Sequence, residues 1–458
     1  MDMSEIRHIT SQFRGCYQLP GDPERDVYLL PLSGGADSTA LAIVMKLLYP
    51  EIDFEYIFTD TGAEEPEIYA TLNELEMFLG KPITRIFGGK GLYELIEAWG
   101  GFLPSARDRW CTRALKLEPF REWLKKYAGI QKYMFVGIRA DESSRIAFTL
   151  DEVTTEMPYI DLGVRREDVF RILQASVGIP RYYSRRVRSG CSCCPFQRRS
   201  ERAGLLQAKP IEFKRAMSCE KLSPEDAQRH PEVISFSQES GVAPNWMTLP
   251  LPAKDRMAGR AGRKDSLSLF AEKGVFVGAE FFFDSGLVGD EFIWHQRIVS
   301  YSSSLTGIKR QLQDRYKHLL TTFEALHLDS ADEVRQKARF AIYYVQAPSD
   351  VFDPDGPTAP GTYTWHAGES FRQMEHVIGW SKRILHAEGM RQQVAKYAGA
   401  METSWAFEQH ESSVAALQAV TGETGQVVDS MWFAAQEPTP DDESELDERF
   451  IACPLCQI

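Results

Sequence analysis

The stretch of sequence that decides the fold is "LSGGADSTA", residues 32–40. It follows the apolar run "VYLLPL" (27–32) and overlaps the helical pattern "TALAIVMKLLY" (39–49). Glycines in such a turn let backbone N–H groups approach phosphate oxygens, and the N-terminus of the following helix adds partial positive charge. The stretch therefore predicts a phosphate-binding turn between a strand and a helix. It is not the G-x-x-x-x-G-K-S/T loop, because both that spacing and the lysine are missing.

Several residues of this turn carry groups that suit a bound polyphosphate. The backbone and hydroxyl donors are Ser33, Gly34, Gly35, Ser38 and Thr39. The carboxylate of Asp37 is suited to a magnesium ion on the pyrophosphate, because Mg²⁺ prefers oxygen ligands. A glycine pair alone is also explained by simple turn chemistry, but the complete S-G-G-x-D-S string favours a nucleotide site.

Apolar runs and helical patterns alternate along the first 180 residues. Strands are predicted at 27–32, 54–60, 83–89 and 133–140, and helices at 39–49, 66–80, 91–100, 117–127 and 166–178. This alternation is typical of a parallel α/β sheet with right-handed crossovers, in which ligands bind at the carboxyl ends of the strands. Three stretches are expected at those ends: Ser33–Ser38, Thr59–Gly62 and Gly137–Arg145.

The composition is that of a soluble protein with more than one domain. The 458 residues exceed the size of one ordinary core, and 43% are hydrophobic and 26% charged. We find no secretory h-region at the N-terminus and no apolar run long enough for a membrane span, so a cytoplasmic location is expected. In a reducing compartment the eight cysteines are better explained as metal ligands or redox thiols than as disulfides.

The patterns divide the chain into four parts. We expect an N-terminal extension (1–26), an ATP-binding α/β domain (27–180), a basic cysteine-cluster segment (181–245), and a mainly helical C-terminal domain (246–458) that ends in an acidic segment and "CPLC". Within the last part, "GVFVGAEFFFDSG" (274–286) is interpreted as a buried strand.

The charge of the chain is acidic overall but basic in one place. The net charge is −13, whereas residues 181–215 hold ten Arg or Lys against two acids, Glu201 and Glu212. Such a density can attract polyanions, so nucleic acid (DNA or tRNA) is a candidate partner. A solvated basic face, or arginines that face nucleotide phosphates, are the alternatives.

Five motifs in order carry a resemblance to a known family. They are "SGGADS" (33–38), "FTDTGAEEPEIY" (58–69), "CTRALKLEP" (111–119), "VGIRADESSR" (136–145) and "GCSCCPF" (190–196). Over residues 27–200 the chain resembles the PP-loop ATP pyrophosphatases. Within them it resembles the phosphoadenosine phosphosulfate (PAPS) reductase-like branch, and the DndC-type DNA phosphorothioation ATPases in particular. The resemblance implies bound ATP or an adenylyl sulfate, and either adenylation of a substrate or reduction of activated sulfate.

The resemblance also implies roles for individual residues. The loop Ser33–Ser38 would hold the pyrophosphate or sulfate end, and Asp60 would lie near the nucleotide or a metal. Gly137 opens the segment that contains Arg139 and Arg145, whose charges would neutralise phosphate during displacement. Surface pairing with nearby acids is the alternative for the arginines. Many relatives have a lysine where Ala36 stands, so this chain departs from the pattern there.

The cysteines suggest a metal site. Cys191 and Cys194 are spaced C-x-x-C, which allows two thiolates to bind one metal from a tight turn. Cys219 would complete the ligand set from the far end of a helix. Cys111 matches a cysteine that some family members bring to the same cluster. Four cysteines fit an iron–sulfur cluster, 4Fe–4S, with zinc as the alternative. Cys193 is predicted to be a spectator, because adjacent residues rarely both bind one ion.

A second C-x-x-C, Cys453 and Cys456, lies beside the acidic C-terminal segment. It suits a redox or sulfur-carrying tail, half of a partner-bound zinc site, or a tail without a catalytic role. The reactive-cysteine string that PAPS reductases carry near their C-terminus is absent here.

Three functions are compatible with these features. The leading hypothesis is an ATP-dependent sulfur-transfer enzyme that adenylates a substrate, with nucleic acid as acceptor and a protein such as a cysteine desulfurase as sulfur donor. The second is a reductase of adenylyl sulfate or PAPS. The third is a non-catalytic, nucleotide-binding subunit of a nucleic-acid-directed defence or mobile-element system.

Overall fold

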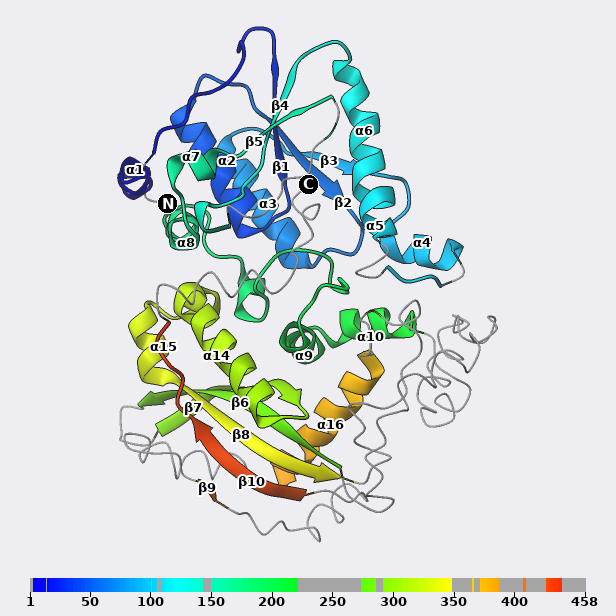
Figure 1. The fold of residues 1–458 in the computed structure, drawn as a ribbon, viewed down its shortest axis with the longest axis vertical. Helices are drawn as coiled ribbons and strands as arrows, with labels where there is room; N and C mark the ends of the chain where they lie inside the picture. Colours follow the sequence, from blue (N-terminus) through cyan, green and yellow to red (C-terminus); the bar gives the residue numbers. More distant parts are fainter. Residues whose placement is uncertain are drawn as a thin grey trace.

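Two β-sheets with helices packed against them make up the computed structural model of the chain (Figure 1). The structure describes residues 3–13, 15–99, 101–104, 109–142, 150, 152–220, 273–285, 291–347, 365, 371–387, 407–408 and 426–438. Within these residues, we find no helix that combines the length and the apolar character needed to cross a membrane.

The first sheet is parallel and has five strands. They are β1 (Val27–Leu32), β2 (Glu55–Asp60), β3 (Thr84–Phe87), β4 (Lys132–Phe135) and β5 (Thr154–Glu156). Their order is β3-β2-β1-β4-β5, with every pair parallel, so β1 is the central strand. The predicted α/β fold with a parallel sheet is confirmed. The short edge strand β5 was not predicted, because its sequence "TTE" carries no apolar run.

Helices cover both faces of the parallel sheet. The residues of β1 alternate between two cores: Leu30 and Leu32 pack on one side and Leu29 on the other, all fully buried. The first side is covered by α1 (Met3–Ser11), α2 (Ala36–Leu48), α3 (Pro66–Leu79), α7 (Pro158–Leu162) and α8 (Arg166–Ala175). The second side is covered by α6 (Glu118–Leu124). Burial on both faces explains why these strands are continuous apolar runs.

The remaining elements of the first 220 residues are short. They are α4 (Leu92–Ala98), α5 (Trp110–Thr112), the π-helix η1 (Arg113–Leu117), η2 (Lys125–Tyr127), η3 (Ala140–Glu142), η4 (Arg181–Ser184), α9 (Arg199–Ala208) and α10 (Pro210–Ser218). The predicted boundaries of α3 are confirmed, with Pro66 in its first turn and Gly80 in the left-handed conformation at its end.

The second sheet is antiparallel and also has five strands. They are β6 (Lys273–Ser285), β7 (Glu291–Ser302), β8 (Ala338–Ala347), β9 (Phe407–Glu408) and β10 (Gln426–Phe433), in the order β7-β6-β8-β10-β9. The helical elements around it are α14 (Leu305–Thr322), η6 (Phe323–Leu326), α15 (Ala331–Lys337) and α16 (Phe371–Ala387). The predicted strand at 274–286 is therefore confirmed as β6.

The prediction of a mainly helical C-terminal domain is corrected by this sheet. Residues of β6 and β8 pack on both faces, against α14 and α15 on one side and against α9 and α16 on the other. Strands covered on both faces lose the apolar–polar alternation that marks a half-buried strand. Their pairing also joins residues far apart in the sequence, so local patterns favoured only the helices.

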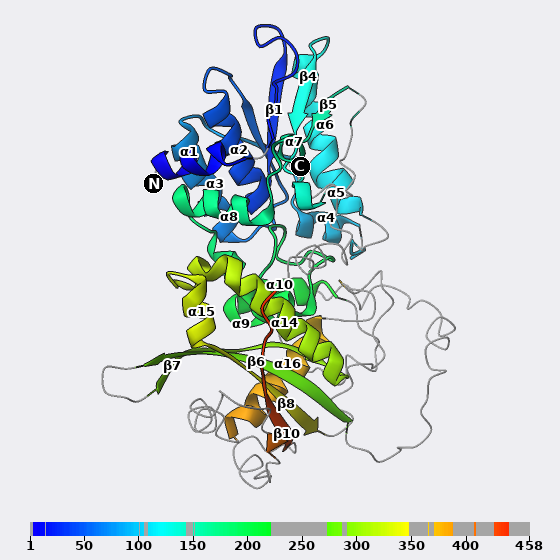
Figure 2. The ribbon, with the colours of Figure 1, turned by 60° about the vertical axis from the view of Figure 1, so that its left-hand side comes forward.

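The cysteine segment, residues 185–198, runs between the two sheets. The helix α9 that follows it packs on β7, where Arg199 donates to the carbonyl oxygen of Tyr301 at 2.7 Å and Gln207 donates to that of Ile298 at 2.7 Å. Both views show α9 and α14 between the parallel and antiparallel sheets (Figures 1 and 2). The helix that follows the cysteine segment is thus anchored on the antiparallel sheet.

Candidate functional site

The loop Ser33–Ser38 lies at the carboxyl end of the central strand and opens α2, as predicted. Ser38 Oγ accepts from the backbone N–H of Ser33 at 3.1 Å and lies 3.1 Å from Ser33 Oγ. The side-chain oxygen of Thr39 is fully buried and has no hydrogen-bond partner in the structure. The loop therefore combines hydroxyl groups with the N-terminus of a helix, the arrangement that binds phosphate.

Gly34 is required by the shape of this loop. Its φ is +65°, in the left-handed region that L side chains rarely adopt. A Cβ at this position would lie 2.6 Å from Cγ2 of Ile68, which belongs to α3. The loop therefore turns tightly against the helix that follows the second strand.

Asp37 and Arg139 meet across the site. Arg139 Nη1 donates to Asp37 Oδ1 at 2.8 Å, and the guanidinium also binds Asp141 at 3.1 Å and Glu142 at 2.9 Å. The Arg139 side chain is only 3% exposed. Arg139 thus pairs with the neighbouring acids, one of its two predicted alternatives, and its role toward phosphate stays a prediction. Arg145 lies outside the described residues.

Gly137 explains how the two segments come so close. A Cβ on Gly137 would lie 3.0 Å from the carbonyl oxygen of Asp37, so a larger residue would push the loop and the fourth strand apart. The missing side chain at Gly137 therefore allows the two strand ends to approach each other as predicted.

The turn after β2 forms the next wall of the site. Asp60 Oδ1 accepts from the N–H of Gly62 and from the hydroxyl of Tyr69, both at 2.8 Å. Thr61 Oγ1 donates to Glu64 at 3.0 Å and lies 3.2 Å from the sulfur of Cys191. The carboxylate of Asp60 is thus oriented by its own turn, at the strand end where the nucleotide was expected.

The cysteine segment folds onto both of these loops. Ser189 Oγ donates to Ser33 Oγ at 3.2 Å, and the N–H of Ser192 donates to the carbonyl oxygen of Ala63 at 2.9 Å. A Cβ on Gly35 would lie 2.5 Å from Ser189 Oγ. The cysteine segment is therefore in direct contact with the loop Ser33–Ser38, the candidate nucleotide loop.

A buried ion-pair group holds the cysteine segment to the turn after β2. Glu65 is fully buried and pairs with the guanidinium groups of Arg185 and Arg186, with 2.6 Å between Arg186 Nη1 and Glu65 Oε1. Arg186 also donates to the carbonyl oxygen of Gly190 at 2.8 Å. These two arginines belong to the basic segment but are internal. Together with Arg202, which is also buried, they are not part of a basic surface.

The cysteines are close in space but point in different directions. Cys191 faces Thr61 and Glu64, whereas Cys193, fully buried, accepts a hydrogen bond from Tyr93 at 3.4 Å. Burial raises the pKa of Cys193, and the neighbouring groups of Cys219, Cys194 and Cys111 contribute to the shift. Cys193 thus lies among the predicted ligands rather than apart from them.

The four predicted cysteine ligands do not form a metal-binding group in the described part of the chain. Across the described ranges, no group of three or more His, Cys, Asp or Glu side chains is arranged to hold a metal ion. The assignment of Cys111, Cys191, Cys194 and Cys219 as ligands therefore stays a prediction. Cys453 and Cys456 lie outside the described residues.

Four residues of this site were not singled out by the sequence analysis. They are Glu65, Tyr182, Tyr183 and Ser189, and each acts through a contact that joins distant parts of the chain. Of these four residues, only Glu65 has a signal in the local sequence. It stands beside Glu64 in an acidic pair with no basic residue nearby in the sequence, which indicates a partner elsewhere in the chain.

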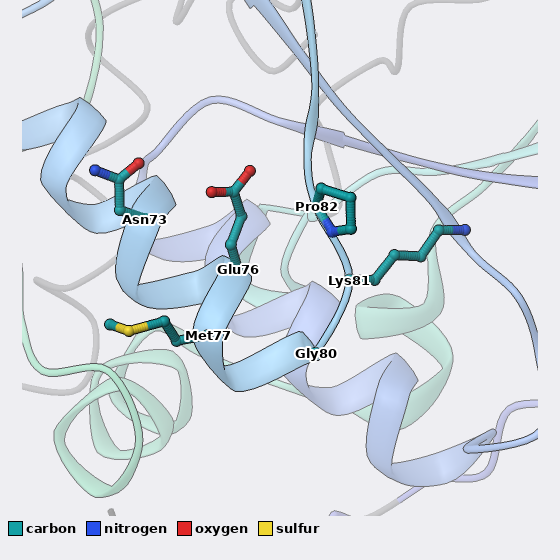
Figure 3. Close-up of a pocket in the computed structure, with 6 residues that line it drawn as sticks. All are labelled: Asn73, Glu76, Met77, Gly80, Lys81 and Pro82. Atoms are coloured by element: carbon teal, nitrogen blue, oxygen red, sulfur yellow. The ribbon is translucent and has the colours of Figure 1, made fainter.

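A separate surface hollow lies at the opposite end of the sheet (Figure 3). Its volume is about 440 Å³, and it lies where α3 ends and the chain returns to β3. The lining residues are Asn73, Glu76, Met77, Gly80, Lys81 and Pro82. Because ligands of parallel α/β sheets bind at the carboxyl ends of the strands, this hollow is not the candidate site.

The chain is similar to known proteins over part of its length. Two uncharacterized proteins of Methanocaldococcus jannaschii are 33% identical over 116 residues and 34% identical over 126 residues. These matches cover 25% and 27% of this chain, and the chain spans only 23% and 28% of the relatives' own length. An uncharacterized nin region protein of Escherichia phage lambda is 28% identical over 148 residues, covering 26% of this chain and 50% of that protein.

Two solved structures are also similar. A PAPS reductase from Candida auris, in a phosphate complex, aligns with a TM-score of 0.28 and 12% identity, over 38% of this chain and 86% of that chain. A U34-tRNA thiolase from Methanococcus maripaludis with its 4Fe–4S cluster aligns with a TM-score of 0.29 and 14% identity, over 53% of this chain and 80% of that chain. Residues 28–151 match the family profile of the phosphoadenosine phosphosulfate reductase domain.

Proposed function

We propose that the chain is an ATP pyrophosphatase that adenylates an oxygen of a nucleic acid, as the first half of a sulfur transfer. The observation that carries the proposal is the loop Ser33–Ser38 at the N-terminus of α2, enclosed by the turn after β2 and by the cysteine segment. An acceptor oxygen attacks the α-phosphorus of ATP, and the bond to the β-phosphate breaks. Its electron pair leaves on pyrophosphate. A sulfur nucleophile from a donor protein then displaces AMP.

The residues of the loop would bind the leaving pyrophosphate. Backbone N–H groups at the start of α2 point toward a ligand at its N-terminus, and the helix dipole favours negative charge there. The hydroxyls of Ser33 and Ser38 lie within this loop, and the buried hydroxyl of Thr39 has a free hydrogen-bonding capacity. Donors already in place at the developing charge lower the barrier without reorganisation.

The charge balance of the site favours ATP bound as its magnesium complex. One cation, Arg139, faces three carboxylates, those of Asp37, Asp141 and Glu142. A free polyphosphate would be repelled by the excess negative charge, whereas a divalent ion would offset it. Asp37 uses one oxygen for Arg139, so its other oxygen is suited to the magnesium that arrives with the substrate.

The nucleic acid acceptor is supported by the basic residues that remain at the surface. Arg181, Lys214 and Arg215 are exposed and lie on either side of the cysteine segment in the sequence. Phosphate contacts by such residues are the main source of nucleic-acid affinity.

Product analysis under anaerobic conditions tests the proposal. We would incubate the full chain with ATP labelled at the α-phosphate, Mg²⁺, and either duplex DNA or tRNA, and quantify AMP and pyrophosphate. The expected result is one pyrophosphate per AMP, at a rate that depends on the nucleic acid. ADP and phosphate as products would contradict the proposal. Sulfite release from adenylyl sulfate without nucleic acid would instead support a reductase, and binding without turnover a non-catalytic subunit.

Two variants separate the magnesium role from the ion pair. Asp37→Asn and Glu142→Gln each remove one carboxylate partner of Arg139, at 2.8 Å and 2.9 Å respectively. Only Asp37→Asn is expected to raise the Mg²⁺ concentration required for half-maximal pyrophosphate release. An equal shift in both variants would show that Asp37 acts through its ion pair with Arg139 and not as a magnesium ligand.

A further inference from the structure

Two adjacent tyrosines hold the nucleotide loop from outside the matched domain. Tyr182 Oη donates to the carbonyl oxygen of Gly34 at 2.8 Å, and the N–H of Ala36 donates to Tyr183 Oη at 2.9 Å. Both tyrosines belong to η4 and are buried, at 0% and 3% exposure. The two hydroxyls thus fix the peptide groups on either side of Gly35.

The Tyr183 hydroxyl provides a hydrogen-bond partner for the N–H of Ala36, which has none within the helix. The first N–H groups of a helix have no partner within it, and Ala36 is the first residue of α2. The Tyr183 hydroxyl accepts from that N–H, so this group does not depend on a ligand for its hydrogen bond. The curvature of the loop is therefore set in advance, which reduces the ordering cost that binding would otherwise carry.

Tyr183 is in turn held by the C-terminal region. His318 of α14 donates from Nε2 to the carbonyl oxygen of Tyr183 at 2.5 Å, and both side chains are buried. Burial, together with the nearby charges of Arg315 and Arg166, lowers the pKa of His318 well below its usual range. The imidazole is thus neutral, with the proton on Nε2. The short helices η4 and η6 also pack against each other.

We propose that the C-terminal sheet domain positions the nucleotide loop through His318 and Tyr183. This inference rests on the proposed function, because it assigns the loop to nucleotide. Tyr183 is a positioning residue for Ala36, and His318 is a positioning residue for Tyr183. The nucleotide affinity of the α/β domain therefore depends on a side chain that lies 135 residues further along the chain.

Four variants of the full chain test the connection. Tyr183→Phe removes the acceptor and keeps the ring, and His318→Leu removes the donor. His318→Gln retains an N–H at the place of Nε2 and is the conservative rescue. Leu312→Ala, in the buried core of α14, is the control for general destabilisation. Hydrogen exchange of the amides at residues 34–39 measures the loop without any ligand.

The expected result is faster exchange of these amides in Tyr183→Phe and His318→Leu, but not in His318→Gln or Leu312→Ala. The affinity for ATP with Mg²⁺, measured by titration calorimetry, should fall about tenfold in the first two variants only, as expected for one lost hydrogen bond in a buried site. Unchanged exchange in Tyr183→Phe, or equal acceleration in Leu312→Ala, would overturn the inference.

The two proposals fail in different ways. If the wild-type chain does not bind ATP while exchange at residues 34–39 responds as described, the nucleotide assignment is wrong and the positioning role stands. If ATP binds the wild type and all four variants with equal affinity, the positioning role is wrong and the nucleotide site stands.

Discussion

Two buried groups in this chain have the same composition, one glutamate between two arginines, but different surroundings. The first is Glu65 with Arg185 and Arg186, and the second is Glu280 with Arg297 and Arg315. Both glutamates are fully buried, and the ion-pair distances are similar, 2.6 Å from Arg186 to Glu65 and 2.6 Å from Arg297 to Glu280. Similar chemistry is thus found in both halves of the molecule.

What differs is the structure that each group joins. The Glu65 group ties the turn after β2 to the cysteine segment, next to the nucleotide loop. The Glu280 group ties β6, β7 and α14 together inside the second sheet domain. Because the loss of either glutamate removes a carboxylate partner from two largely buried arginines, both groups should matter for stability. Only the first should matter directly for ligand binding.

The largest expected effect comes from removing the glutamates. Glu65→Gln and Glu280→Gln should each lower the free energy of unfolding by about 3–5 kcal/mol, because each leaves two arginines buried beside a neutral side chain. Glu65→Gln should also abolish ATP binding, whereas Glu280→Gln should retain it at low temperature. Urea unfolding and calorimetric titration measure the two quantities. Loss of ATP affinity in both variants would remove the distinction between the groups.

A second pair of substitutions sharpens the comparison through backbone crowding. Gly34→Ala would place a Cβ 2.6 Å from Ile68 at a φ of +65°, and Gly278→Ala would place one 2.8 Å from Leu312 in the second sheet domain. Each should cost about 1–3 kcal/mol of stability through overpacking. Only Gly34→Ala should weaken ATP binding, because it alone reshapes the nucleotide loop. Similar ATP affinities for the two variants would contradict that expectation.

The pH dependence of stability tests the link between the two regions. His318 is neutral in the native state, but in the unfolded chain it takes up a proton below about pH 6.5. The contribution of His318 to the free energy of unfolding is therefore complete above that pH. It is lost as the pH falls, by about 1.4 kcal/mol per pH unit. The groups facing it are Arg315, Arg166 and Arg198.

The stability difference between the wild type and His318→Gln should thus shrink as the pH falls below 6.5. Denaturant unfolding between pH 5 and 8 measures it, with the exposed residue His8 changed to Gln as the control. A difference that is constant with pH would show that His318 takes up its proton equally in the native and unfolded states.

The smallest effect is expected at the hollow beneath α3. Met77 is 69% exposed and lines this hollow at the end of the sheet remote from the nucleotide loop. Met77→Ser should change the free energy of unfolding by less than about 0.5 kcal/mol and leave ATP binding unaltered. A clear loss of affinity would move the candidate site from the carboxyl ends of the strands to this surface.

The parallel sheet could be predicted from the sequence because its signals are local. The run at 27–32 coincides with β1, and Pro66 and Gly80 mark the ends of α3. The meeting of Ser33–Ser38 with Arg139 also followed, since the ends of neighbouring parallel strands must lie together.

The remaining features depend on contacts that no local pattern reveals. The strands β8 and β10 form a sheet by long-range pairing and are covered by helices, so their sequences lack alternation. The contact of Tyr183 with Ala36 spans 147 residues, and the pairing of Glu65 with Arg186 spans 121. The basic segment was interpreted as a surface because burial of arginines depends on partners elsewhere in the chain.

The tyrosine contacts determine where this protein can be divided into fragments. The matched family domain ends at residue 151, yet the nucleotide loop is supported by Tyr182, Tyr183 and Ser189, and through them by His318. A fragment cut at the boundary of the matched domain would contain the loop without its supports. The α/β domain is therefore not an interchangeable module, and grafting it onto another scaffold would require the cysteine segment and α14 to be transferred with it.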